Sequence, residues 1–346
     1  MLKIALALGL LLQDAPVSRV EAPIKVCATT PILGDLARRL GGDGVEVTVL
    51  AKGNEDMHFV RLRPSFIEAA HTADLFLENG AGLEVGWLPV VLERARNPRI
   101  RLGAERNFDA SRHLTSRILP TGPVDRSQGD VHPEGNPHAF LDPLNGLSVA
   151  KALAEVLVIL RPGDAAGIRE RLAGFQEDLA VRMYGKALVG RYGSDLCELD
   201  GLGRLVPFLE KRGHLDELGG WVGRLRPFAE TRLVAEHALW AHFTKRFGLV
   251  VAAYVEPLPG ISPSSGYLTR LIGRMKDEGL GVVLGASYFD QRITDRVVEA
   301  TGAVLVPMAH QCGSRTGTDD YLSLLAHDVD VLAAALEARR KAEAGK

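Results

Sequence analysis

Residues Ile24–Leu50 read IKVCATTPILGDLARRLGGDGVEVTVL, and this stretch decides the fold. It opens with a β-prone run, Ile24–Thr29, and continues with apolar side chains at three- and four-residue spacings over Leu33–Leu40. That spacing is typical of a helix with one buried face. The glycine pair Gly41-Gly42 stops the helix, and β-branched residues then alternate over Val45–Leu50. The stretch therefore predicts a strand, a helix and a second strand.

The same alternation continues along the chain and resumes after a long interruption. We expect further strands at Ala73–Leu77, Ile100–Leu102, Arg232–Ala235, Val250–Val255, Gly281–Leu284 and Val304–Pro307. We expect further helices near 64–70, 83–95, 147–157, 238–247, 267–278, 292–301 and 321–338. Strands that alternate with helices form parallel sheets covered by helices on both faces. The predicted fold class is α/β, with two lobes of this kind.

Three segments between these runs have their own patterns. A long amphipathic helix is predicted from Asp164 to about Leu188, and one helix of this length can join two lobes. The segment 107–137 is rich in Gly, Pro, Ser and Asp and is expected to be a long surface loop that carries function. We interpret 190–227 as an insertion of helix and turn. The predicted division is a signal segment at 1–22, an N-terminal lobe at 23–160, a linking helix at 161–190 and a C-terminal lobe at 191–346.

Composition limits the possible functions. The 346 residues are enough for two domains, and 46% hydrophobic and 24% charged residues are typical of a globular protein. There are 41 basic and 43 acidic side chains. A net charge near zero lacks the basic surface that nucleic-acid binding requires, so we expect no nucleic-acid partner.

The N-terminus and the cysteines bear on the compartment. Lys3 is followed by an uncharged apolar run, Ile4–Leu12, which has the proportions of a secretory signal and is too short to span a bilayer. We therefore expect export to the periplasm or extracytoplasmic face. Cys27, Cys197 and Cys312 contain no Cys-x-x-Cys pair, which argues against a thiolate zinc site and allows at most one disulfide.

Four of the ten histidines fall just beyond predicted strands or in a rigid loop. They are His58, His138, His237 and His310. His138 lies between Pro137 and Pro143, which restrict the backbone on either side. In open α/β sheets, ligands bind beyond the carboxyl ends of the strands. Four imidazoles, two from each lobe, would satisfy tetrahedral zinc, although imidazole also suits copper and nickel.

Several motifs make the chain resemble the zinc and manganese substrate-binding proteins of ABC importers, known as the cluster A-I metal receptors. Asn136-Pro137-His138 with Leu141-Asp142-Pro143 is similar to the second-ligand motif of the family. Asp56-Met57-His58 is similar to the first-ligand motif, with Met57 in place of the usual proline, and Glu236-His237 is similar to the third. Val26–Leu36 is similar to the family's first strand and turn.

The resemblance implies two α/β lobes joined by one long helix, a metal ion held between them and an ABC permease as partner. We accordingly expect a monomer that is not an enzyme, with Zn²⁺ as the transported ligand and Mn²⁺ as the less favoured metal. The ligands implied are His58, His138, His237 and His310. The last departs from the family pattern, in which an Asp is usual, and Asp290 and Glu256 are the alternatives for it.

The remaining histidines have other expected roles. We expect His132 to be a solvated loop residue, with metal capture or direct contact with the metal as its alternative. We expect His71, His113, His214, His242 and His327 to be structural or surface residues.

Two other classes of protein stay open at this point. A zinc hydrolase could use three of these histidines, with a water activated by Glu236 or Asp290, although the chain has no His-Glu-x-x-His sequence. A metal chaperone or an adhesin could be built on the same fold.

Overall fold

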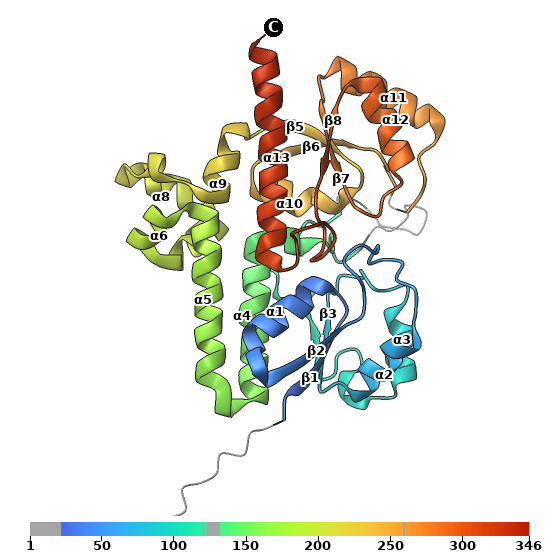
Figure 1. The fold of residues 1–346 in the computed structure, drawn as a ribbon, viewed down its shortest axis with the longest axis vertical. Coiled ribbons are helices and arrows are strands. Elements are labelled where there is room, and N and C mark those ends of the chain that lie inside the picture. The colour runs from blue at the N-terminus through green and yellow to red at the C-terminus, as the bar shows by residue number, and fades with distance from the viewer. Residues whose placement is uncertain (1–21, 121, 123–131, 259, 346) are drawn as a thin grey trace, which may run out of the picture.

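The computed structural model describes residues 22–120, 122, 132–258 and 260–345, which form two stacked α/β lobes (Figure 1). Each lobe contains one four-stranded sheet in which every pairing is parallel. The strands of the N-terminal lobe are β1 (Ile24–Ala28), β2 (Val45–Val49), β3 (Leu75–Glu78) and β4 (Asn107–Asp109). Those of the C-terminal lobe are β5 (Arg232–Ala235), β6 (Val250–Tyr254), β7 (Val282–Gly285) and β8 (Val304–Pro307).

The two sheets have the same topology. Their strand orders are β2-β1-β3-β4 and β6-β5-β7-β8. In each lobe a helical connection follows the first strand and leads to the second strand, which pairs with one side of the first. The third strand pairs with the other side. The predicted fold class of two parallel-sheet lobes flanked by helices is confirmed.

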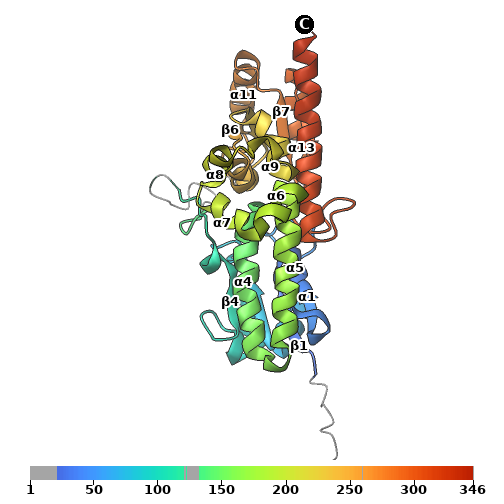
Figure 2. The same ribbon diagram turned by 90° about the vertical axis from the view of Figure 1, so that its left-hand side faces the viewer.

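Helices cover the sheets and fill the space between them (Figures 1 and 2). In the first half of the chain they are α1 (Pro31–Gly41), α2 (Pro64–Thr72), α3 (Leu88–Ala95), α4 (Pro143–Leu160) and α5 (Ala165–Tyr184). In the second half they are α6 (Lys186–Tyr192), α7 (Leu196–Gly201), α8 (Leu205–Arg212), α9 (Gly220–Leu225), α10 (Ala241–Arg246), α11 (Ser265–Asp277), α12 (Gln291–Thr301) and α13 (Tyr321–Ala344).

The opening helix shows how the sequence specifies an element. Pro31 stands at the first helical position of α1, where its missing N–H is no loss. The apolar side chains of Leu33, Leu36 and Leu40 are fully buried. The helix ends at Gly41, and the capping residue Gly42 has a φ of 52°, which favours glycine.

One strand lies where the sequence did not predict it. The prediction of a strand at Ile100–Leu102 is wrong, because Ile100 is the last residue of a 3₁₀ turn and packs into the apolar cluster with Phe66 and Trp87. The fourth strand is β4, which lies inside the segment 107–137 that the sequence predicts to be a loop. Phe108 is the one buried residue of this strand. A three-residue strand with one apolar side chain carries too little alternation to be recognised.

The segment predicted to link the lobes contains a long helix, which ends at Tyr184 because Gly185, with φ of 88°, interrupts it before α6. The long helix α5 packs on α1 and α4 of the N-terminal lobe and, further along, on α9 (Figure 2). Its C-terminal end leads into the short helices α6–α8 of the insertion. The exact division at 160, 190 and 191 stays a prediction, and the predicted signal segment at 1–22 lies almost wholly outside the described residues.

One of the three buried apolar clusters in the described residues extends through both lobes. A single cluster of buried apolar side chains includes Leu33 of α1, Leu153 of α4 and Leu325 of α13. Helix α4 is long and apolar enough to cross a membrane by composition, but more than half of it is buried in the protein. That length and composition are weak evidence for a membrane span, because core helices share them. The three cysteines are free and buried.

Candidate metal site

The candidate ligands lie at the facing edges of the two sheets. His58 follows β2 and His138 stands immediately before a 3₁₀ turn, Ala139–Leu141, that leads into α4. His237 is two residues past β5, and His310 is three residues past β8. All four side chains are buried or nearly so. The carboxyl ends of the parallel strands therefore bring these segments to the junction of the lobes.

Three of the four predicted ligands stand together with a fourth imidazole, that of His132. The ring of His58 lies 5.2 Å from the ring of His138 and 6.1 Å from that of His237, measured between centroids. The rings of His138 and His237 are 5.8 Å apart. The ring of His132 lies 5.2 Å from that of His58. These four residues form what we call the histidine cluster, and it draws on both lobes.

The placement of His132 differs from the expectation of a solvated loop residue. Its Nε2 lies 3.2 Å from Nε2 of His58. The turn at Ala81 and Gly82 holds the other side of the ring, with a hydrogen bond to the backbone of Ala81. Direct contact with the metal is the alternative role expected from the sequence for His132, and the fold favours it by bringing together two histidines that are 74 residues apart.

His58 is oriented by its own loop. Its Nδ1 lies 2.8 Å from Oδ1 of Asp56, and its backbone N–H donates to the same oxygen at 3.0 Å. Burial raises the pKa of the Asp56 carboxyl, but the hydrogen bonds and charge of His58 outweigh this effect and lower it. An ionised carboxylate that accepts from Nδ1–H leaves the Nε2 lone pair directed at the cluster, as partners of metal-bound histidines do.

His138 is held by two amide side chains of the N-terminal lobe, and one of them also reaches the C-terminal lobe. The Asn136 side-chain oxygen accepts from the backbone N–H of His138 at 2.9 Å, and its Nδ2 donates across the junction to the carbonyl of Ala238 at 2.6 Å. Asn79 donates to the carbonyl of Pro137 at 2.9 Å. Nε2 of His138 is buried and has no hydrogen-bond partner among the described residues. An unpartnered nitrogen in this position is suited to bind a cation.

The environment favours neutral imidazoles. Burial, and next the charge of His58, lower the pKa of His132 and of His237 to about 4, and they lower that of His138 well below its usual 6.5. Neutral rings are the form that binds metal. The cluster is therefore ready for a cation near neutral pH without first releasing protons from these three residues.

His310 is buried beside the cluster, but its Nε2 lies 3.1 Å from the backbone oxygen of Glu55. Its ring packs on Tyr288 with centroids 4.8 Å apart, and its Nδ1 has no partner among the described residues. Burial lowers its pKa to about 4. In this arrangement His310 connects the two lobes through the His58 loop.

The two carboxylates considered for the fourth ligand, Asp290 and Glu256, both accept hydrogen bonds from other groups. Asp290 caps α12 and pairs with Arg292 at 2.9 Å. Oε1 of Glu256 lies 4.0 Å from Nδ1 of His237 and accepts from the backbone N–H of Gly260.

Two cavities flank the histidine cluster. One, of about 200 Å³, is lined by His132, His138 and His237. The other, of about 210 Å³, is lined by Asp56, His58 and His237. Solvent can therefore approach the cluster from two sides.

The spacing of the rings can be compared with zinc geometry. Four imidazoles bound to one zinc ion at ~2.0 Å in tetrahedral directions have ring centres roughly 5 Å apart. The measured centroid separations of 5.2 to 6.1 Å are slightly wider. Consistently, no group of three or more His, Cys, Asp or Glu side chains in the described ranges already stands in a metal-holding arrangement. Small ring movements would be needed to close four nitrogens on one ion.

Two parallel-sheet lobes with imidazoles gathered at their junction define a metal-binding protein of the receptor type. The family described as "ZnuA: Zinc-uptake complex component A periplasmic" matches residues 26–182 and 213–335. The chain belongs to this family, whose members are non-enzymatic metal-binding transport receptors. This confirms the resemblance found in the sequence and removes the basis for the hydrolase alternative.

Relatives in the family carry names with different metals. The chain is 26% identical over 182 residues to the manganese ABC transporter substrate-binding lipoprotein PsaA of Streptococcus pneumoniae, covering 51% of this chain and 55% of the relative. It is 26% identical to the iron-binding protein YfeA of Yersinia pestis, covering 89% of this chain and 85% of the relative. The matches to the streptococcal lipoproteins span only about half of their length.

Solved structures show the same fold. A crystal structure of ZnuA has a TM-score of 0.64 at 20% identity, covering 90% of this chain and 99% of that one. The periplasmic zinc-binding protein TroA of Treponema pallidum also scores 0.64, at 18% identity, covering 91% of this chain and 99% of that one. At these identities the likeness concerns the fold alone.

Proposed function

We propose that this protein is an extracytoplasmic substrate-binding protein that captures a divalent transition metal and delivers it to an ABC permease. The observation that carries the proposal is the histidine cluster, because it joins imidazoles from both lobes within 5.2 to 6.1 Å. Membership of the family and the lipoprotein names of several relatives support export and transport.

Zinc is the metal that we propose. The cluster offers four imidazoles, and the carboxylate that contacts it, Asp56, bonds to Nδ1 of His58, on the side of the ring opposite to the nitrogen that would bind metal. Manganese prefers oxygen ligands, whereas zinc accepts four nitrogens in tetrahedral geometry. The relatives named for manganese and iron make these two metals the necessary comparisons.

We assign His58, His138 and His237 as ligands, in agreement with the sequence prediction. His132 is better placed than His310 to be the fourth, because its Nε2 already lies 3.2 Å from Nε2 of His58. Two nitrogens on one tetrahedral zinc ion lie ~3.3 Å apart. His310 stays a prediction as a ligand, since its Nε2 is directed at the carbonyl of Glu55.

The four groups would act as a closed shell. Asp56 keeps the Nδ1 proton of His58 in place, so Nε2 can bind metal. Asn136 fixes the backbone of His138 and reaches the C-terminal lobe. A site filled by protein ligands leaves no position for an activated water, which suits a carrier and not a hydrolase.

The test is metal binding by the metal-stripped protein, measured for Zn²⁺, Mn²⁺ and Fe²⁺ by competition with a chromophoric chelator. We expect one tight Zn²⁺ site, and we expect His138→Ala to weaken it by about 100-fold or more, since a buried ligand is lost. His71→Ala is the matched control, because His71 bonds to the carbonyl of Ala95 away from the cluster. Zinc affinity unchanged in His138→Ala, or Mn²⁺ bound more tightly than Zn²⁺, would contradict the proposal.

Delivery to a permease needs a separate test. A strain that lacks this protein should grow poorly when zinc is scarce and recover with added zinc. Recovery by the wild-type chain and not by His138→Ala would support transport, whereas recovery by both would point to a role independent of the metal, such as adhesion.

A further inference from the structure

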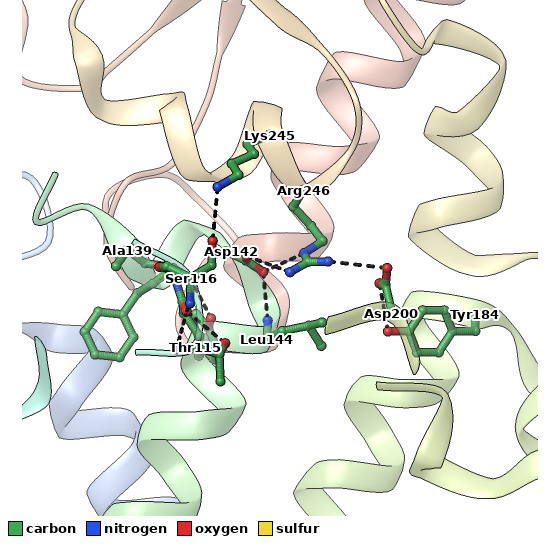
Figure 3. Close-up of polar contacts among 12 residues, drawn as sticks. Thr115, Ser116, Ala139, Asp142, Leu144, Tyr184, Asp200, Lys245 and Arg246 are labelled. Carbon is green, nitrogen blue, oxygen red and sulfur yellow. Dashed lines mark hydrogen bonds and ion pairs between the residues drawn. The ribbon is translucent and has the colours of Figure 1, made fainter. Parts of the chain in front are cut away.

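Arg246 forms a buried ion pair across the junction of the two lobes (Figure 3). It is the last residue of α10, and its side chain is only 12% exposed. Its Nε donates to Oδ1 of Asp142 at 2.8 Å and its Nη2 donates to Oδ2 at 2.9 Å. Two parallel bonds of this kind fix the relative orientation of both side chains.

A third nitrogen of the same guanidinium is held by the helical insertion. Nη1 lies 3.3 Å from Oδ1 of Asp200, and Oδ2 of Asp200 accepts from the hydroxyl of Tyr184 at 3.0 Å (Figure 3). Tyr184 and Asp200 lie in the stretch 183–212, which the family match omits. A part of the chain outside the matched residues therefore supplies a support for Arg246.

The charges in this group depend on one another. Burial lowers the pKa of Arg246, but Asp142 and Asp200 outweigh it and raise the pKa. Asp142 is only 3% exposed. When one partner of such a buried pair is removed, an uncompensated charge remains, which makes the group sensitive to substitution.

The ion pair joins the segment that carries His138 to the segment that carries His237. Asp142 is four residues after His138, separated from it by the buried turn Ala139–Leu141, and it caps α4 by accepting from the N–H of Leu144 at 3.0 Å. Arg246 is nine residues after His237 and is connected to it by a short 3₁₀ turn and α10. The distance between His138 and His237 thus depends on how α10 docks against the start of α4.

We propose that Arg246 is a positioning residue for the metal site: through Asp142 it sets the spacing of His138 and His237, and Asp200 of the insertion holds the guanidinium in place. The inference rests on the proposed function, since it concerns the same site. It also assigns a role to the insertion at 190–227.

The main test compares Arg246→Gln with wild type by chelator competition for Zn²⁺ and by the visible spectrum of bound Co²⁺. We expect zinc affinity to fall by about tenfold or more, the effect typical of residues that orient ligands. The Co²⁺ spectrum should also change from the tetrahedral pattern, a change that a loss of stability alone would not produce. Arg224→Gln is the matched control, since Arg224 pairs with Asp330 at an exposed position within the C-terminal lobe. It should leave both readouts unchanged.

A second set of variants covers the case in which Arg246→Gln does not fold. Asp142→Asn keeps an oxygen to cap α4 but loses the bidentate acceptor, and Asp200→Asn removes only the support from the insertion. We expect the first to weaken zinc binding as much as Arg246→Gln does, and the second to weaken it less. The double variant Asp142→Asn with Arg246→Gln should bind zinc no more weakly than either single variant. The reason is that each substitution by itself already breaks the pair between Arg246 and Asp142.

Wild-type zinc affinity and Co²⁺ spectrum in folded Arg246→Gln or Asp142→Asn would overturn the inference while leaving the proposed function standing. Additive losses in the double variant would also overturn it. Failure of the wild-type protein to bind zinc would instead reject the proposed function.

Discussion

At the scale of single residues, two histidines, His132 and His310, are the candidates for the fourth ligand. The ring of His132 belongs to the histidine cluster, whereas His310 uses its Nε2 to hold the carbonyl of Glu55. We expect His132→Ala to weaken zinc binding by about tenfold to 100-fold and to open one coordination position to water. His310→Ala should have a smaller effect on zinc affinity.

The measurement for this pair is zinc competition together with X-ray absorption spectroscopy of the bound zinc, which counts imidazole ligands. Four imidazoles in wild type and three in His132→Ala is the expected result. If instead His310→Ala loses one imidazole and His132→Ala keeps four, the assignment made from the sequence is right and His132 is not a ligand.

The lowered histidine pKa values predict a pH dependence of stability. Burial lowers the pKa of His237 and His310 to about 4, whereas the unfolded chain protonates near 6.5. As pH falls between these values the unfolded state takes up protons at these histidines and the folded state does not, so each of them lowers the free energy of unfolding of the metal-free protein. The loss is about 2 kcal/mol per fully buried histidine by about pH 5. The raised pKa values of the buried Glu78 and Glu236 carboxyls act in the opposite direction, so the histidine contribution is isolated by comparing variants.

Urea unfolding of metal-free wild type and His310→Gln at about pH 7.5 and about pH 5 isolates the contribution of one histidine. Relative to wild type, His310→Gln should gain about 2 kcal/mol between the two pH values, because one buried histidine has been removed. The same pH dependence in both proteins would show that His310 is not kept neutral in the folded protein.

At the scale of elements, the packing of α4 on the start of α13 is tight. A Cβ at Gly146, in the first turn of α4, would overlap the hydroxyl of Tyr321, which donates to the carbonyl of Phe140 at 2.6 Å. Gly146→Ala should therefore lower the free energy of unfolding by about 1 to 3 kcal/mol. A Cβ at Gly174 of α5 would meet nothing within 4 Å.

Gly174→Ala is the matched substitution, and it should raise the free energy of unfolding by about 0.5 to 1 kcal/mol, since alanine favours helix more than glycine does. Both variants are compared with wild type in urea at one pH. Equal effects of the two substitutions would mean that helix propensity, and not the contact with Tyr321, decides the outcome.

At the scale of the whole molecule, the lobes are fastened together on more than one side of the site. Beyond the pair of Arg246 and Asp142, the backbone N–H of Tyr321 donates to Asp35 at 3.1 Å, and that of Ile32 donates to the side chain of Gln311 at 3.2 Å. These contacts span the junction near α1 and α13, and the shared apolar core lies behind them. Large opening would break all of them at once, so we expect small loop and ring movements to admit the metal.

This rigidity predicts how the whole protein responds to zinc. Ligand binding to the folded state alone stabilises it by about 4 kcal/mol at a concentration 1,000-fold above Kd, so the Tm should rise. The radius of gyration from X-ray scattering should stay the same within the precision of the measurement. A clear decrease on zinc binding would show that the lobes close as rigid bodies about a flexible connection.

Local patterns in the sequence were enough to determine the α/β class, seven of the eight strands and three segments with candidate ligands. The reason is that alternation and helical spacing are properties of neighbouring residues, and His58, His138 and His237 follow motifs or strand ends that can be read locally. Only the tertiary structure decided the position of β4, the approach of His132 to His58 and the bond from His310 to Glu55. It also decided the pairing of Arg246 with Asp142, 104 residues away. These contacts join loops and helices from distant parts of the chain. Which residues meet therefore depends on how the segments pack in three dimensions, and the periodicity of the sequence carries no information about it.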